Sequence, residues 1–230
     1  DLHGAFSTSP HQYDLAWHVR GREPTSPELT FEAMKFAEPV SNGYNSLANV
    51  RHASTDKAWT LTMVAKSGQP RRLVRAGGAP AEVILGDGWF EKRKERPLTI
   101  IERRKGRTSD VFGTVVDISG SKEPFVRSVG QEGGLKAGYG LLKVETAAGT
   151  DLCFVAYRPG MYKASGLETD AIQAMVLTDK DGVRAMYLAG GKTLKVGGAS
   201  IERGEAGLVY VERLPNGTFV VSNPSPTDAE

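Results

Sequence analysis

The chain has 230 residues, with 29 lysines and arginines against 27 aspartates and glutamates and a net charge of +2. This length accommodates one large or two small domains. The nearly balanced charge argues against a nucleic-acid-binding protein, because acidic residues interleave with basic ones throughout. No apolar run approaches the roughly 20 residues needed to span a bilayer. Cys153 is the only cysteine, which excludes an internal disulfide and a cysteine-based zinc site.

The sequence begins at Asp1-Leu2-His3-Gly4, with no initiator methionine, signal peptide or polar leader before it. We therefore expect the chain to be a piece of a longer product. Its cellular compartment cannot be deduced from this end.

The first predicted element is a strand at residues 13–19 that alternates strictly between two faces. One face carries the large apolar side chains of Tyr13, Leu15, Trp17 and Val19. The other carries Asp14, Ala16, His18 and Arg20. We expect the first face to be buried and the second to present an acid, an imidazole and a guanidinium.

Three of the four histidines, His3, His11 and His18, lie in the first eighteen residues, and such a cluster suggests metal binding or acid–base chemistry. On a straight strand, however, Asp14 and His18 lie about 13 Å apart, because each residue rises about 3.3 Å. Metal–ligand distances are about 2 Å, so these two side chains cannot share one ion. Any partners of His18 must come from neighbouring strands or from outside this chain. His11 follows Pro10 in a predicted loop.

The later segments almost all have the two-residue period of strands, separated by turns rich in glycine, proline or aspartate. The predicted strands are 59–65, 71–76, 81–86, 98–104, 111–118, 141–146, 152–157, 172–178, 183–189, 193–196, 199–202, 207–213 and 218–222. Hairpin turns are predicted at 179–182, 190–191 and 214–217, where glycine tolerates positive φ. A short helix is predicted near Phe31–Phe36, closed by Pro39.

These elements predict an all-β protein of stacked antiparallel sheets or a β-sandwich. A weak boundary falls in 119–138, where Ser119-Gly120-Ser121-Lys122 and Gln131-Glu132-Gly133-Gly134 interrupt the strand pattern. We predict a central antiparallel sheet domain at 1–120, incomplete at its N-terminus, and a smaller C-terminal sheet layer at 121–230.

Basic residues gather in three clusters. They are Arg71-Arg72 with Arg75, Lys92-Arg93-Lys94 with Arg96, and Arg103-Arg104-Lys105 with Arg107. One interpretation is that they are solvated strand ends and loops. The other is a positive rim for an anionic polymer, since guanidinium groups bind carboxylate or sulfate in a bidentate fork. Beside the second cluster, Trp89-Phe90 is either a sugar-stacking platform or a buried anchor.

Several motifs in chain order resemble the heparinase II/III-like polysaccharide lyases, and among them the alginate and oligoalginate lyases. The first is Tyr13-Asp14-Leu15-Ala16-Trp17-His18 followed by Gly21, similar to the family's segment of aromatic, Asp, apolar residues, His and Gly. The others are Gly43–Arg51 followed by Trp59, then 81–88, 97–104 and 112–117, and Gly190-Gly191-Lys192-Thr193-Leu194.

The resemblance implies an N-terminal (α/α) toroid followed by stacked antiparallel β-sheets, of which this chain is the β portion. Such lyases cleave a polyuronate by β-elimination. A base removes the C5 proton, nearby groups stabilise the enolate-like charge, and the 4-linked sugar leaves. The Tyr and His acid–base pair and an Asn lie mainly on the toroid, so the catalytic residues are expected upstream of this chain.

The resemblance also assigns roles to residues of the β portion, which typically contributes a cleft-facing histidine and one zinc or similar divalent ion. His18 matches the metal-ligand histidine, and Asp1 lies near the expected place of the ligand aspartate. Asp14, Arg20 and His11 are candidates for the substrate cleft. The implied partners are the toroid and an anionic polysaccharide or oligosaccharide, alginate first and heparan-type next. The implied location is periplasmic or extracellular.

A different class of function fits the same sequence. A stand-alone carbohydrate-binding or structural β-sandwich has the same strand pattern and needs no catalytic residues. Helical periodicity in the coding region upstream would favour the lyase. A native start just before Asp1, after a signal peptide, would favour the binding module.

Overall fold

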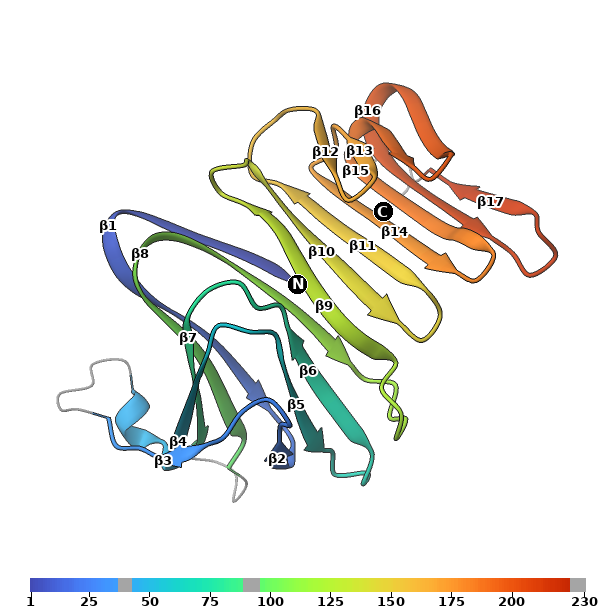
Figure 1. Ribbon diagram of the computed structural model, residues 1–230. Coiled ribbons are helices and arrows are strands. Elements are labelled where there is room, and N and C mark those ends of the chain that lie inside the picture. Colours follow the sequence, from blue (N-terminus) through green and yellow to red (C-terminus); the bar gives the residue numbers. More distant parts are fainter. Residues whose placement is uncertain (37–42, 89–95, 224–230) are drawn as a thin grey trace, which may run out of the picture. The chain divides into compact units, whose positions relative to one another are not determined.

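The computed structural model describes residues 1–36, 43–88 and 96–223. Its regular structure is almost entirely antiparallel β-sheet, so the predicted all-β fold is confirmed (Figure 1). The chain divides into an N-terminal unit, Ala5–Pro124, and a C-terminal unit formed by Asp1–Gly4 and Phe125–Glu230. The break between Pro124 and Phe125 lies within the segment where glycine interrupts the strand pattern. No helix in the described ranges is long and apolar enough to cross a membrane.

The N-terminal unit is built on a sheet with the strand order β2-β5-β6-β8-β7-β4-β3, and β1 lies beside β8. Its strands are β1 (Leu2–Val19), β2 (Arg22–Thr25), β3 (Glu32–Ala33), β4 (Ala48–Thr55), β5 (Trp59–Val64), β6 (Pro70–Arg75), β7 (Ala81–Asp87) and β8 (Leu98–Asp117). The first part of β8 pairs with β7, and its last part, Thr114–Asp117, pairs with β6. Figure 1 shows β1 and β8 as long, curved strands. Because β8 pairs with β7 at its start and with β6 at its end, this single strand runs through both parts of the curled sheet.

The core of the N-terminal unit follows the strand alternation. On β5, Trp59, Leu61 and Met63 point inward and are buried. Trp17 and Val19 of β1 are half-buried and pack against this core, as predicted for the apolar face of that strand, whereas Tyr13 and Leu15 are half-buried outside this cluster. Gly21 follows at the end of β1, where a Cβ atom would lie 2.8 Å from the Met63 Cβ. The chain can therefore pass this close to β5 only with glycine at that position.

The C-terminal unit is a second antiparallel sheet, with the order β12-β13-β15-β14-β11-β10-β9 followed outward from β15 by β16 and β17. Its strands are β9 (Val126–Gly134), β10 (Tyr139–Thr146), β11 (Thr150–Ala156), β12 (Tyr162–Ala164), β13 (Leu167–Thr169), β14 (Gln173–Asp179), β15 (Gly182–Val196), β16 (Ala199–Arg213) and β17 (Phe219–Ser222). The predicted turns at 179–182 and 214–217 are present, with Gly182 at φ 100° and Gly217 at φ 82°.

The predicted hairpin at Gly190-Gly191 is wrong, because both glycines lie inside β15. The pairing with β16 shifts register here, which marks a β-bulge. A Cβ on Gly191 would lie 2.6 Å from the Ala171 Cα. Glycine is thus needed for a close backbone approach within the sheet.

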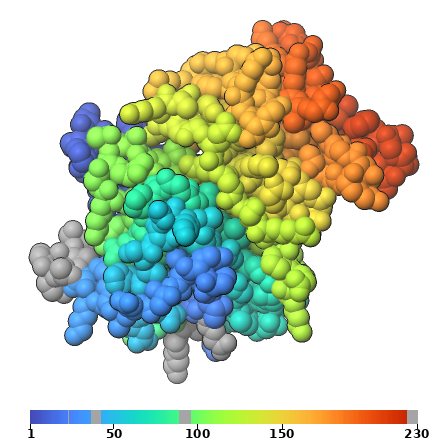
Figure 2. Space-filling model, in the orientation of Figure 1, coloured from blue at the N-terminus to red at the C-terminus, as the bar shows by residue number. Residues whose placement is uncertain are grey.

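The helix predicted near Phe31–Phe36 is also wrong. Glu32 and Ala33 form β3 instead, paired with His52 and Arg51 of β4. A six-residue helix is unstable alone, so pairing with β4 determines the conformation. The only helical turn among the described residues is the 3₁₀ turn η1, Tyr44–Ser46. This part of the chain lies on the surface of the N-terminal unit, light blue in Figure 2. Pro39 lies outside the described residues.

Candidate functional site

The polar face of β1 meets the outward-facing side chains of β8. His18 is exposed, and its Nδ1 lies 3.1 Å from the hydroxyl of the buried Thr99. This hydrogen bond fixes the ring, while Nε2 makes no hydrogen bond within the described part of the chain. Histidines that bind a ligand through one nitrogen are commonly held through the other in this way.

Asp14, four residues before His18 on the same face of β1, forms a bidentate ion pair with Arg103 of β8. The Nε–Oδ1 and Nη2–Oδ2 distances are both 2.9 Å. Only 12% of the Asp14 side chain and 9% of the Arg103 side chain are exposed. The rings of Phe36 and Tyr44 flank the guanidinium, each centroid 5.7 Å from the Arg103 Cζ. The hydrogen bonds that Arg103 donates to Asp14 raise the pKa of the Arg103 guanidinium. Both Asp14 oxygens are therefore engaged, and Asp14 anchors β1 to β8.

The row of charges continues across the sheet to β7 and β4. Glu82 is paired in register with Arg103, and its carboxylate lies 4.0 Å from the Arg103 Nη1. The other Glu82 oxygen lies 2.8 Å from the Nδ1 of His52. Lys105 approaches Glu82 at 3.7 Å. Asp14, Arg103, Glu82 and His52 thus form a row of alternating acidic and basic groups, contributed by four strands.

Tyr44 closes one side of this row. Burial raises the pKa of its phenol to about 12, and the charge of Asp14 and a hydrogen bond to it add to the rise. At neutral pH the phenol is protonated and donates to the Asp14 carboxylate. The hydroxyl therefore stabilises the negative charge of Asp14 by a hydrogen bond and is not available as a general base.

The Asp14→Asn substitution should lower the pKa of Tyr44 from about 12, because it removes two of the causes of the rise and leaves Arg103 unopposed. An ultraviolet titration of tyrosinate, with the signal of Tyr44→Phe subtracted, measures this pKa.

The same pKa shift makes stability depend on pH. A group whose pKa is higher in the folded than in the unfolded protein adds stability at pH values below its unfolded-state pKa, and this stability is lost as the pH rises through its folded-state pKa. Tyr44 should accordingly contribute stability up to about pH 10 that is lost as the pH rises to about 12. A Tyr44 pKa unchanged in Asp14→Asn would refute the contact.

The remaining predicted site residues are contributed by different parts of the structure. Asp1 belongs to the C-terminal unit, where its carboxylate lies 2.9 Å from the Nε2 of His3. His11 is exposed within β1, not in the predicted loop, and its ring lies 3.1 Å from the Ser9 hydroxyl. Arg20 is exposed just beyond the end of β1.

A divalent ion is therefore not accommodated by this chain as described. In residues 1–36, 43–88 and 96–223, no three histidine, cysteine, aspartate or glutamate side chains are placed to hold one ion. His18 offers one free ring nitrogen, and the Asp14 oxygens, four residues earlier on the strand, are bound by Arg103. The assignment of His18 and Asp1 as ligands stays a prediction.

The basic clusters are divided between the surface and the core. Arg71, Arg96 and Lys105 are exposed, as the solvated interpretation expects. Arg72, Arg75, Arg103 and Arg104 are buried, so these four are neither solvated loop residues nor a rim for a polymer. Each pairs with a carboxylate: Asp117, Glu102, Asp14, and Glu102 with Asp110, respectively. Lys92-Arg93-Lys94 and Trp89-Phe90 lie outside the described residues.

Known families do not identify the chain. No protein-family model matches it, and no curated protein sequence does. The lyase resemblance therefore depends on the sequence motifs alone.

Proposed function

We propose that this chain is the β-sheet portion of a polysaccharide lyase that acts on a uronate-containing anionic polysaccharide, alginate first and heparan-type next. The observation that carries the proposal is His18, exposed on the face of a sheet and held through one ring nitrogen by Thr99. The free nitrogen is available to a substrate or to a group from the toroid. Substrates of this class place the protein in the periplasm or outside the cell.

In this proposal the chain supports β-elimination rather than performing it. The C5 proton of a uronate is weakly acidic, so its removal requires the sugar carboxylate to be neutralised. His18 and Arg20 are the groups of this face that can donate to a carboxylate or hydroxyl. The Asp14–Arg103 pair fixes the strand that carries them. The base and the leaving-group acid belong to the (α/α) toroid.

One observation favours the second candidate function, a non-catalytic carbohydrate-binding or structural β-sandwich. Most charges on this face are already paired, since Asp14, Arg103, Glu82 and His52 each lie within ion-pair distance of another member of the row. Paired charges stabilise the sheet and need no substrate. The two functions differ in whether a polymer is cleaved.

An ultraviolet assay for the new C=C bond distinguishes them, with alginate, heparan sulfate and glucuronan as substrates. We expect no cleavage by this chain alone and cleavage by a longer product that includes the toroid. In that product His18→Ala should lower the rate about 10-fold or more. The exposed His3 is the matched control, and His3→Ala should leave the rate unchanged. Binding without cleavage by the longer product would support the carbohydrate-binding function instead.

A further inference from the structure

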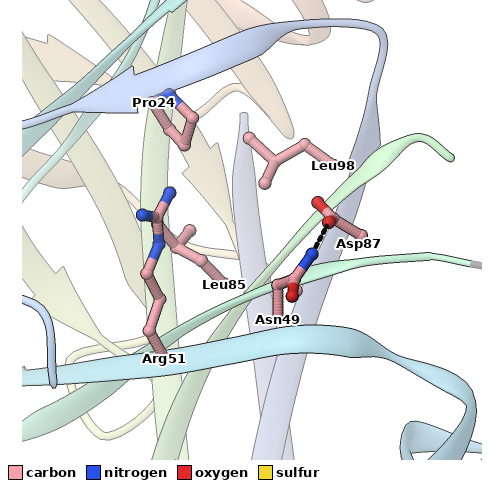
Figure 3. A pocket seen from close by; sticks show the side chains of 7 residues that line it. Pro24, Asn49, Arg51, Leu85, Asp87 and Leu98 are labelled. Atoms are coloured by element: carbon pink, nitrogen blue, oxygen red, sulfur yellow. Dashed lines mark hydrogen bonds between the residues drawn. The ribbon is translucent and has the colours of Figure 1, made fainter. Parts of the chain in front are cut away.

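A separate pocket of about 290 Å³ lies within the N-terminal unit, between β2 and the β4–β7–β8 strands (Figure 3). It is lined by Pro24, Asn49, Arg51, Leu85, Gly86, Asp87 and Leu98. Arg51 is paired in register with Leu85, and Leu85 and Leu98 belong to the hydrophobic core. The pocket is therefore on the core side of the sheet, whereas His18 and Thr99 lie on the outer side.

Arg51 brings a positive charge to one side of the pocket, across from Asp87. Its side chain is half-buried, and its guanidinium lies 5.8 Å from the centroid of the Phe31 ring. Among the residues whose side chains the structure describes, it makes no ion pair or hydrogen bond, unlike the buried arginines of the same unit. Figure 3 shows the guanidinium pointing into the pocket toward Pro24 and Leu85. A partly desolvated guanidinium without an acceptor is unfavourable, and a carboxylate satisfies it with two parallel hydrogen bonds.

The opposite side of the pocket carries a polar pair. The Asn49 side-chain amide donates to the Asp87 carboxylate at 2.6 Å, as drawn in Figure 3. Asn49 has φ 52°, one of only two non-glycine residues with positive φ in the described ranges. Residues held in the left-handed region are concentrated at ligand sites. The second Asp87 oxygen and the Asn49 carbonyl remain available as acceptors for hydroxyl groups.

We propose that this pocket binds a small sugar acid, a single hexuronate in size. Arg51 binds the carboxylate, Asp87 and Asn49 accept hydroxyls, and the C–H surface of the sugar packs on Pro24 and Leu98. The volume is close to the lower end of known small-molecule sites, about 300 Å³. A neutral sugar would leave Arg51 without its acceptor. A simple carboxylate would leave Asp87 and Asn49 unused and would face the charge of Asp87.

This inference goes beyond the lyase proposal and does not depend on it, because the pocket and His18 are on opposite sides of the sheet. The pocket can bind a sugar acid as an effector or as the end of a polymer in a protein that cleaves nothing. Conversely, lyase activity in the longer product does not require this pocket. The two proposals therefore fail separately.

The test is a titration of the ¹⁵N-labelled 230-residue chain with D-glucuronate, D-glucose and acetate, followed by NMR. We expect glucuronate to shift the Arg51 Nε–H and Asn49 amide signals and to bind at least 10-fold more tightly than glucose or acetate. Arg51→Gln should weaken glucuronate binding at least 10-fold and remove its advantage over glucose. Arg51→Lys should retain part of that advantage, because it keeps the charge but not the fork.

The matched control is Arg71→Gln, which removes an exposed arginine outside the pocket and should leave binding unchanged. The dispersion of the amide signals establishes that each variant is folded. If Arg51→Gln does not fold, Arg51→Lys takes its place as the test variant. The proposal is overturned if glucose binds as tightly as glucuronate, or if Arg51→Gln and Arg51→Lys bind as wild type does. Absence of any shift with tens of millimolar glucuronate overturns it as well.

Discussion

Replacement of Glu102 by glutamine should lower the free energy of unfolding of the N-terminal unit by about 3–5 kcal/mol. Glu102 is 1% exposed and bridges two buried arginines. One carboxylate oxygen accepts from the Arg75 Nε at 2.5 Å and the other from the Arg104 Nε at 2.8 Å. Glutamine preserves the shape but removes the charge, which leaves two buried cations with too few acceptors.

The surroundings of this cluster explain why the loss should be large. Arg75 is fully buried, and that burial lowers the pKa of its guanidinium despite the contact with Glu102. Trp17 lies 5.4 Å from its Cζ, and Phe112 lies 4.5 Å from the Arg104 Cζ. Aromatic rings interact favourably with a cation but do not replace a carboxylate. Without Glu102, the negative charge that still acts on Arg75 is that of Asp110, which already pairs with Arg104 and Arg107.

Urea unfolding followed by tryptophan fluorescence measures the change. All three tryptophans fall between residues 5 and 124, so the signal comes from the N-terminal unit. Glu32→Gln is the matched control, since Glu32 is exposed on β3 of the same unit. Its effect should stay within about 0.5 kcal/mol. Equal effects of the two substitutions would show that the buried cluster contributes no net stability.

The sequence predicts those parts of the fold that depend on local pattern. The alternation of β1 identifies Trp17 and Val19 as residues that pack on the core, and the glycine turns at 182 and 217 follow from backbone sterics. Strand β9 has no such signal, because it contains Gly130, Gly133 and Gly134, and its pairing with β10 establishes it. The predicted helix fails for the same reason, because β4 supplies a pairing partner that no local pattern reveals.

Charged residues in the core are harder to predict, since arginine pairs in a sequence usually indicate a surface. Arg75 and Glu102 are 27 residues apart, and Asp14 and Arg103 are 89 apart. Only the strand order β6-β8-β7, with β1 beside β8, brings them together. The alternation could not assign these charges to a face, because Ile100 and Ile101 lie on opposite faces of β8 and both are fully buried. The pocket around Arg51 could not be anticipated, as its lining comes from four strands.

The second large effect should come from the ion pair between β1 and β8. Asp14→Asn or Arg103→Met alone should each lower the free energy of unfolding by about 2–4 kcal/mol, somewhat less than a fully buried pair. Each substitution leaves the other partner inside a contact that is about one-tenth exposed. The double variant should cost little more than either single one, which gives a coupling energy of about 2 kcal/mol.

The cycle also decides between two roles for Asp14. Strong coupling means that Asp14 is committed to Arg103 and acts by holding β1, with His18 four residues along the same face, against β8. The Arg103→Met variant then tests what an unpaired Asp14 carboxylate does on this face, because it frees the carboxylate without removing it. Coupling near zero would contradict the anchoring role. In that case the carboxylate is available to hydroxyls of a bound polysaccharide, and Asp14 acts as a cleft residue on a strand held by the packing of Trp17 and Val19 alone.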